Sequence, residues 1–244
     1  MSGRFPPVFS YDDPRVDPQR LRRISGDDDD LLLVGVVHDH PASIARVQRV
    51  LEATRPDVLA LELPPAAIEL YRTYAGEGST PPERGGEMSA AIEAASEATV
   101  VGIDAPNPSY VGRLFTRLVA DRASPTTTRR VVSGLTSATR EAIACRLAAT
   151  LPEAASRAIA PTDRIEYAVD AEDAPQRQVD HERAHVATVQ ALLASGSGDA
   201  LRYRDETREA CMIDRLEDLR ARGDVVAIVG VDHLEALEAG LSYR

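Results

Sequence analysis

The stretch Leu31-Leu-Leu-Val-Gly-Val-Val37, followed directly by His38-Asp-His-Pro41, is the most informative part of the sequence for the fold. A short continuous apolar run of this kind predicts a strand that is buried on both faces. Proline at position 41 suits the first turn of a helix, because its missing amide hydrogen would lack a partner there in any case. Apolar side chains then recur at helical spacing from Ile44 to Leu51. The stretch therefore predicts a strand that leads into a helix.

Three more apolar runs predict strands, and helical patterns separate them. Strands that alternate with helices indicate a parallel sheet, because right-handed crossovers return each strand in the same direction. We therefore expect an α/β fold with a small central sheet, parallel throughout or mixed, that is flanked by helices. We expect residues 1–29 to form an irregular N-terminal tail and residues 30–244 to form a single domain. Within that domain, we expect a long all-helical middle segment at about residues 108–194. The three further strands are predicted at residues 57–63, 99–104 and 224–230.

The composition excludes some classes of function. The 244 residues include 28 basic residues, all of them arginine, against 39 acidic residues, which gives a formal net charge of −11. This balance argues against binding to nucleic acid or to an anionic membrane, since both need a basic patch. The absence of lysine excludes lysine nucleophiles and Schiff bases, and the acidic, lysine-free composition resembles that of halophilic proteins.

Cysteine usage and apolar run length bear on location. The two cysteines, Cys145 and Cys211, are not spaced as metal ligands, which is typical of reduced proteins. No apolar run is long enough for a signal peptide or a membrane span. We expect a cytoplasmic protein, and the sequence leaves its oligomeric state open, a homodimer included.

A polar residue stands at or just past the end of each predicted strand. In an open parallel sheet these positions fall on one edge, where ligand crevices of such folds lie. Histidine and carboxylate side chains are ligands of zinc, manganese and related divalent ions. The four residues are His38, Glu62, Asp104 and His233.

Each of the two histidines stands three residues after a glycine. Gly35 and Gly230 would leave room for a neighbouring strand or a substrate to approach closely. The ordinary alternative is that polar residues at strand ends only meet solvent or cap helices, as His40 and Asp232 could do.

Six short motifs, taken in order, resemble those of a known family. They are Gly35-Val-Val-His38 with Pro41, Arg55-Pro-Asp-Val-Leu-Ala-Leu-Glu62-Leu63, Gly85-Gly-Glu87-Met88, Gly102-Ile-Asp104, Arg208-Glu-Ala-Cys-Met212 and Val225-Val-Ala-Ile-Val-Gly-Val-Asp-His233. The set, which runs from about residue 31 to residue 240, resembles the TraB/PrgY pheromone-shutdown family. That family belongs to a superfamily with the Tiki metalloproteases, the ChaN-like haem-associated proteins and the erythromycin esterases.

The resemblance implies a site built from GxxH motifs and glutamates, used for metal-dependent peptide cleavage in Tiki and for ester hydrolysis in the esterases. Two arginines of the family are missing, because residues 66–68 are Ala-Ala-Ile and residue 105 is alanine. The acidic residue that usually precedes the helix arginine is Thr207 here. Carried over by position, the site residues are His38, Glu62, Glu87, Asp104, Arg208 and His233.

On this basis we expect hydrolysis of a peptide or ester carbonyl, assisted by a divalent metal such as manganese, cobalt or zinc. His38, His233 and Glu62 would hold the ion, and Glu87 or Asp104 would accept a proton from the attacking water. Arg208 would bind a substrate carboxylate or orient Glu62. The partner would be a peptide or another small-molecule substrate. The alternative is a non-catalytic regulator that binds or senses a peptide or ligand, so the sequence leaves open whether the protein is an enzyme.

A second motif, His181-Glu-Arg-Ala-His185, matches the HExxH pattern of zincin proteases. In zincins the two histidines bind zinc and the glutamate acts as base. The charged surroundings of this segment instead favour a solvated helix face that includes Asp180, Glu182 and Arg183.

Overall fold

The structure, a computed structural model, describes residue 5 and residues 12–25, 30–150, 165–194 and 198–242. Its centre is a five-stranded sheet of order β1-β2-β5-β3-β4. Strand β5 pairs in parallel with β2 and β3, β3 pairs in parallel with β4, and β1 pairs antiparallel with β2. The predicted α/β fold with a mainly parallel sheet is therefore confirmed. The strands are β1 (Leu21–Ser25), β2 (Asp30–Val36), β3 (Val58–Leu61), β4 (Thr99–Gly102) and β5 (Val225–Gly230).

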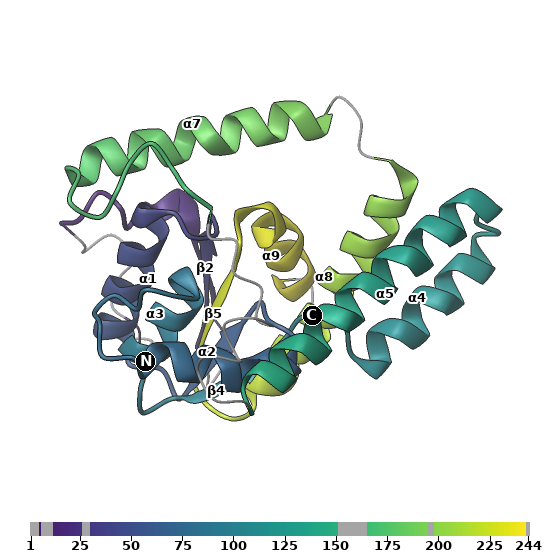
Figure 1. Cartoon of the computed structure of the whole chain (residues 1–244), viewed down its shortest axis with the longest axis horizontal. Helices are drawn as coiled ribbons and strands as arrows, with labels where there is room; N and C mark the ends of the chain where they lie inside the picture. Colours follow the sequence, from purple (N-terminus) through teal and green to yellow (C-terminus); the bar gives the residue numbers. More distant parts are fainter. Residues whose placement is uncertain (1–4, 6–11, 26–29, 151–164, 195–197, 243–244) are drawn as a thin grey trace.

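Helices cover both faces of the sheet (Figure 1). Helices α1 and α3 pack on one face, and α8 and α9 pack on the other. None of the described helices combines the length and the apolar content that a bilayer span requires. The helices are α1 (Pro41–Thr54), α2 (Ile68–Ala75), α3 (Gly86–Ala94), α4 (Pro108–Ala120), α5 (Pro125–Ala148), α7 (Pro175–Ala194), α8 (Asp199–Arg220) and α9 (Leu234–Ser242), with short 3-10 turns η1 (Pro18–Arg20), η2 (Pro65–Ala67) and η3 (Val231–His233).

The alternating side chains of the buried strands fill two cores. In β2, Leu32 and Val34 belong to the cluster that includes the α1 and α3 side chains. Leu31 and Leu33 point to the other face, where they meet the apolar side chains of α8 and α9. All four are at most 2% exposed, and each buried side chain of this size contributes about 1.5–3 kcal/mol. A continuous apolar run was required because both faces of this strand are covered.

The described part of the middle segment is mainly helical and contains no strand, but residues 165–174, before α7, are irregular. Helices α4 and α5 project to one side of the sheet and both contact α8, while α7 lies across one end of the molecule and contacts α1 (Figure 1). In the sequence, the prolines at positions 125, 152, 161 and 175 predict breaks between the helices of this segment. Pro125 and Pro175 each occupy the first position of a helix, as predicted. The two other predicted breaks, at Pro152 and Pro161, lie outside the described residues.

The N-terminal segment departs from the prediction of an irregular tail at residues 1–29. Residues Leu21–Ser25 form β1, which pairs with β2 at the edge of the sheet. Leu21 and Ile24 are buried, whereas Arg22 and Arg23 between them are only partly buried. Two consecutive arginines hide the strand signal in the sequence. They point to opposite faces of the sheet, and each reaches an acidic partner: Arg22 pairs with Glu238 and Arg23 pairs with Asp30.

Candidate functional site

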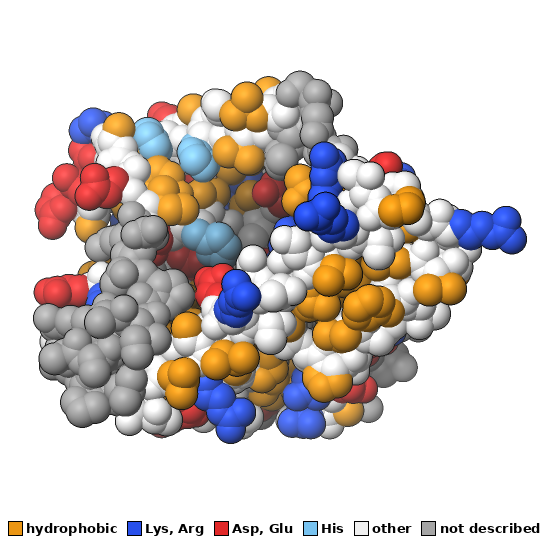
Figure 2. Space-filling view, turned by 45° about the vertical axis from the view of Figure 1, so that its right-hand side comes forward, with side chains coloured by type: hydrophobic (Ala, Val, Ile, Leu, Met, Phe, Trp, Pro, Cys, Tyr) orange, Lys and Arg blue, Asp and Glu red, His pale blue; other side chains and the backbone are white. Residues whose placement is uncertain are grey.

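A cavity of about 660 Å³ lies at the carboxyl ends of the parallel strands. Its lining includes residues that follow β2, β3 and β4, together with residues from α3, α5 and α8. This is the crevice in which open α/β sheets bind ligands. Figure 2 shows one face of the molecule, where histidine side chains lie near acidic ones beside a hollow in the surface. Five of the six predicted site residues line the cavity, namely His38, Glu62, Glu87, Asp104 and Arg208.

His38 and Glu87 form a close pair at this cavity. The imidazole Nδ1 of His38 lies 2.6 Å from Oε1 of Glu87, and the backbone amide of Asp39 donates to Oε2 of Glu87 at 2.8 Å. Asp39 adopts a left-handed conformation with φ of 58°, which aspartate tolerates better than most residues. Glu87 is 2% exposed, so the carboxylate is fixed and both of its oxygens are engaged.

The second ring nitrogen of His38, Nε2, is not engaged by the pairing with Glu87. Among the described residues, no hydrogen bond to Nε2 of His38 is found, and the side chain is 55% exposed. The hydrogen bond with Glu87 is the main cause that raises the pKa of His38 from 6.5 to about 9, against the opposing effect of burial. His38 is therefore mostly an imidazolium at neutral pH, with one N–H directed to Glu87.

Arg208 joins the two carboxylates that follow β3 and β4. Its Nε and Nη2 donate to the two oxygens of Asp104, each at 2.8 Å, and Nη2 also donates to Oε1 of Glu62 at 2.7 Å. The backbone amide of Gly230 donates to Oε2 of Glu62 at 2.6 Å. Burial opposes ionisation of Glu62, but hydrogen bonds and charges from His233 and Arg208 outweigh it and lower the pKa of Glu62 to about 2. Of the two roles expected for Arg208, the structure thus favours the orientation of Glu62.

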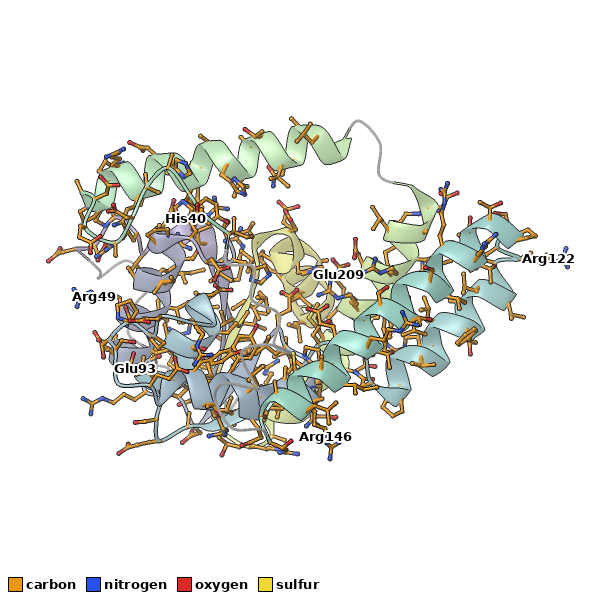
Figure 3. All side chains as sticks on the ribbon, in the orientation of Figure 1. His40, Arg49, Glu93, Arg122, Arg146 and Glu209 are labelled. Atoms are coloured by element: carbon orange, nitrogen blue, oxygen red, sulfur yellow. The ribbon has the colours of Figure 1, made fainter. Side chains whose placement is uncertain are left out.

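His233 is next to Glu62 but is not among the residues that line the cavity. Its Nε2 lies 3.4 Å from Oε1 of Glu62, and its Nδ1 lies 2.8 Å from Oε1 of Glu209. Burial lowers the pKa of His233, but the hydrogen bonds with Glu209 and Glu62 raise it to about 10 overall. Glu209 projects from α8 (Figure 3). His233 therefore acts as a second cation that holds Glu62 in place.

The two GxxH motifs differ in what their glycines accommodate. A Cβ atom on Gly35 would lie 2.3 Å from Cδ1 of Leu234, so Gly35 leaves room for α9 to pack on β2. A Cβ atom on Gly230 would lie 3.4 Å from Oε2 of Glu62, which is ordinary contact. The predicted close approach therefore occurs at Gly35, and its partner is a helix.

The arrangement does not fit the expected metal site. No group of three or more His, Cys, Asp or Glu side chains among the described residues is placed so that it could hold a metal ion. Both oxygens of Glu62 accept hydrogen bonds, and both nitrogens of His233 face carboxylates. Asp104 is engaged by Arg208 through both oxygens. These residues form a network of ion pairs, in which the Arg208 guanidinium stands between the carboxylates.

The glutamate of the HExxH motif is not a solvated side chain. Glu182 is 1% exposed, and its carboxylate accepts hydrogen bonds from Nη2 and Nη1 of Arg46 at 2.5 and 3.0 Å and from the Ser43 hydroxyl at 2.5 Å. Burial raises its pKa, but the charge and hydrogen bonds of Arg46 and the hydrogen bond of Ser43 outweigh burial, so the pKa is lowered overall. The expectation of a solvated Glu182 is therefore wrong, because α7 docks on α1 through this buried ion pair.

The first histidine of that motif, His181, also has a structural contact. Its partner His40 caps α1 by accepting a hydrogen bond at Nδ1 from the Ala42 amide, which confirms the predicted role of His40 as a cap. Nε2 of His40 consequently carries the proton and lies 3.0 Å from Nδ1 of His181. His40 lies beneath α7 in Figure 3, and burial lowers its pKa to about 4. The HExxH segment thus serves to attach α7 to the start of α1.

Two features of the site carry no signal in the sequence. Glu209 follows Arg208 directly in the sequence, but nothing in the pattern links it to His233. Arg204 and Tyr110 line the cavity from α8 and α4, and the helical middle segment offered no motif that would indicate them.

Comparisons with known proteins identify no relative. A scan against protein-family models, a search of curated proteins and a search of solved structures each gave no match to the chain. The resemblance to the TraB/PrgY family therefore stays a prediction.

Proposed function

We propose that the protein is a hydrolase that cleaves an ester or peptide bond of a small molecule, with His38 as the general base. The observation that carries this proposal is the 2.6 Å contact between Nδ1 of His38 and Oε1 of Glu87 at the edge of the cavity. In many hydrolases a buried carboxylate binds one ring nitrogen of a histidine, and this contact orients the other nitrogen to act as the base. The resemblance to the TraB/PrgY family, with hydrolases in its superfamily, supports the same reaction class.

The proposed reaction uses the neutral form of His38. Its Nε2 accepts a proton from a water molecule while the water oxygen attacks the carbonyl carbon of the substrate. Glu87 keeps its hydrogen bond with Nδ1 and stabilises the imidazolium that forms. Nε2–H then returns the proton to the leaving oxygen or nitrogen as the scissile bond breaks.

The ion pairs of Glu62, Asp104 and Arg208 shape the floor of the cavity in this proposal. Every carboxylate oxygen of Glu62 and Asp104 already accepts a hydrogen bond, so neither residue is a good base. We therefore assign the proton transfer to His38 in place of the expected Glu87 or Asp104.

The experiment is a screen of esters and short peptides for turnover, followed by kcat/KM against pH for the best substrate. We expect kcat/KM to rise with pH and to level off near the His38 pKa of about 9, because the base must be neutral. His38→Gln should lower kcat/KM by about 10²–10⁴-fold, as for the loss of a general base. His185→Gln, which alters a histidine that does not line the cavity, serves as the control. Full activity of His38→Gln would overturn the proposal.

A non-catalytic ligand-binding protein is the second candidate. The observation that favours it is that His38 is largely protonated at neutral pH, because its pKa is raised to about 9, while Glu62 and Asp104 are engaged in ion pairs. This candidate predicts that compounds of the screen bind in the cavity but are not hydrolysed even at pH values above the His38 pKa. Measuring binding and turnover of the same compounds separates the two candidates.

A further inference from the structure

Two further arginines line the cavity beside Arg208: Arg84, which pairs with Glu77, and Arg204, whose situation differs. Arg204 stands four residues before Arg208 on α8, so both lie on the same side of the helix, and both line the cavity. Arg208 is bound by Glu62 and Asp104. Among the described residues, Arg204 forms no ion pair with a carboxylate. The cavity wall thus presents a guanidinium whose charge no carboxylate of the described residues neutralises by direct pairing.

The surroundings of Arg204 hold its side chain against the wall. A Cβ atom on Gly134 of α5 would lie 3.4 Å from Nη1 and 3.5 Å from Cδ of Arg204, so a large side chain at position 134 would displace the guanidinium. Gly134 lowers the stability of α5 by about 1 kcal/mol relative to alanine, and the space it leaves is next to the Arg204 side chain. On the other side, Tyr110 is 3% exposed; burial raises the pKa of its hydroxyl, and the nearby Arg204 guanidinium opposes that rise. Arg204 is therefore positioned by two helices, which lie beside α8 in Figure 1.

An apolar strip leads away from Arg204 along α5. Its members recur every three or four residues, which places them on one face of the helix. This face lines the same cavity as His38. The strip consists of Leu135, Ala138, Ala142 and Cys145.

We propose that Arg204 and Tyr110 form a subsite for the carboxylate of the substrate, whose apolar part lies along α5 and whose scissile carbonyl faces His38. The substrate class is then an N-acyl amino acid or a short peptide with a free C-terminus. The assignment of the scissile carbonyl rests on the proposed function, whereas the carboxylate subsite does not. A monoanion suits the site better than a phosphate dianion, because acidic residues such as Glu83 and Glu141 also line the cavity and would repel a second negative charge.

Binding of N-acetyl-leucine, measured by calorimetry, tests the subsite without turnover. The comparison ligands are its neutral N-methylamide and 3-methylbutyl phosphate. All measurements use the full chain carrying His38→Gln, so that the proposed reaction is disabled. With Arg204 intact, this protein should bind N-acetyl-leucine more tightly than either comparison ligand.

The decisive variant is Arg204→Gln. It should weaken binding of N-acetyl-leucine by about 10-fold or more, the size of a lost charge-assisted hydrogen bond, and leave binding of the N-methylamide unchanged. Arg204→Lys should retain most of the affinity because it keeps the charge. Arg202→Gln is the matched control, since Arg202 lies on the same helix and pairs with exposed Asp199.

Three results would overturn the proposal. They are equal binding of N-acetyl-leucine by the Arg204→Gln and Arg202→Gln proteins, tighter binding of the N-methylamide or the phosphate than of the carboxylate, and no binding of N-acetyl-leucine at all. A carboxylate preference without any turnover by the wild-type protein would instead refute the hydrolase and leave the subsite in place.

Discussion

Replacing Glu182 by glutamine tests whether the HExxH segment is structural. The substitution keeps the volume and one oxygen of the side chain but removes the charge that faces Arg46. Arg46 is 0% exposed, and besides Glu182 it donates to the backbone oxygens of Arg15 at 2.7 Å and Gly35 at 2.9 Å. These contacts tie the guanidinium to its buried position, so it cannot reach solvent when its partner changes.

The burial of Arg46 determines how much stability the Glu182→Gln substitution should remove. Removing one partner of a buried ion pair costs about 3–5 kcal/mol, because it leaves the other charge uncompensated. The side-chain amide oxygen of the Glu182→Gln variant still accepts a hydrogen bond from Arg46. We therefore expect the free energy of unfolding to fall by about 3 kcal/mol, the lower end of this range. This is a large share of the roughly 5–15 kcal/mol by which proteins are stabilised.

The assay is urea unfolding followed by circular dichroism, with Asp180→Asn as the control. Asp180 is 63% exposed, and its ion pair with Arg183 is weak because the charged atoms are 4.0 Å apart. The control should therefore change the free energy of unfolding by less than about 0.5 kcal/mol. Because the pKa of Glu182 is lowered in the folded state, its contribution is present above its ordinary value of 4.5 and is lost as the pH falls below it. The difference between wild type and Glu182→Gln should therefore shrink on acidification. A variant as stable as wild type that has lost all hydrolytic activity would refute this reasoning and favour the zincin interpretation.

Three further predictions concern the site and its packing. Arg208→Met leaves Glu62 and Asp104 without their shared partner, and it should lower the free energy of unfolding by about 3–5 kcal/mol in the same assay; an unchanged unfolding midpoint would contradict the ion-pair network. Gly35→Ala should cost about 1–3 kcal/mol, because its methyl group would lie 2.3 Å from the side chain of Leu234, and thermal unfolding measures this loss. Dialysis against a chelator should leave kcat/KM for the proposed hydrolysis unchanged, and activity that disappears and returns on addition of zinc, manganese or cobalt would show that a metal ion takes part.

Strands β2, β3 and β5 were accessible from the sequence because both of their faces are covered, whereas β4, at the far edge of the sheet, is only partly buried. Residues 31–37 were predicted as a strand and residues Asp30–Val36 form one. Strand β1 was missed because two consecutive arginines, one on each face of the strand, interrupt its apolar pattern. Its pairing with β2 depends on the contacts of Leu21 and Ile24 with residues distant in sequence, which no local pattern reveals.

The site was predictable to the extent that strand ends determine it. His38, Glu62 and Asp104 lie at one edge because the strands before them are parallel. The pairing of those side chains was not predictable, because it depends on where α8 places Arg208. Residues contributed by helices alone, such as Arg204 and Glu209, require the packing of α8 against its neighbours to be known.

We propose that Glu87 holds His38 as an oriented base at the cavity, and the pKa of His38 measures this contact most directly. The measurement is an NMR titration of the His38 ring, assigned with the His38→Gln protein and repeated in Glu87→Gln. We predict a pKa of about 9 in the wild-type protein and a lower value, toward the ordinary 6.5 of histidine, in Glu87→Gln. A His38 pKa near 6.5 in both proteins would contradict the account.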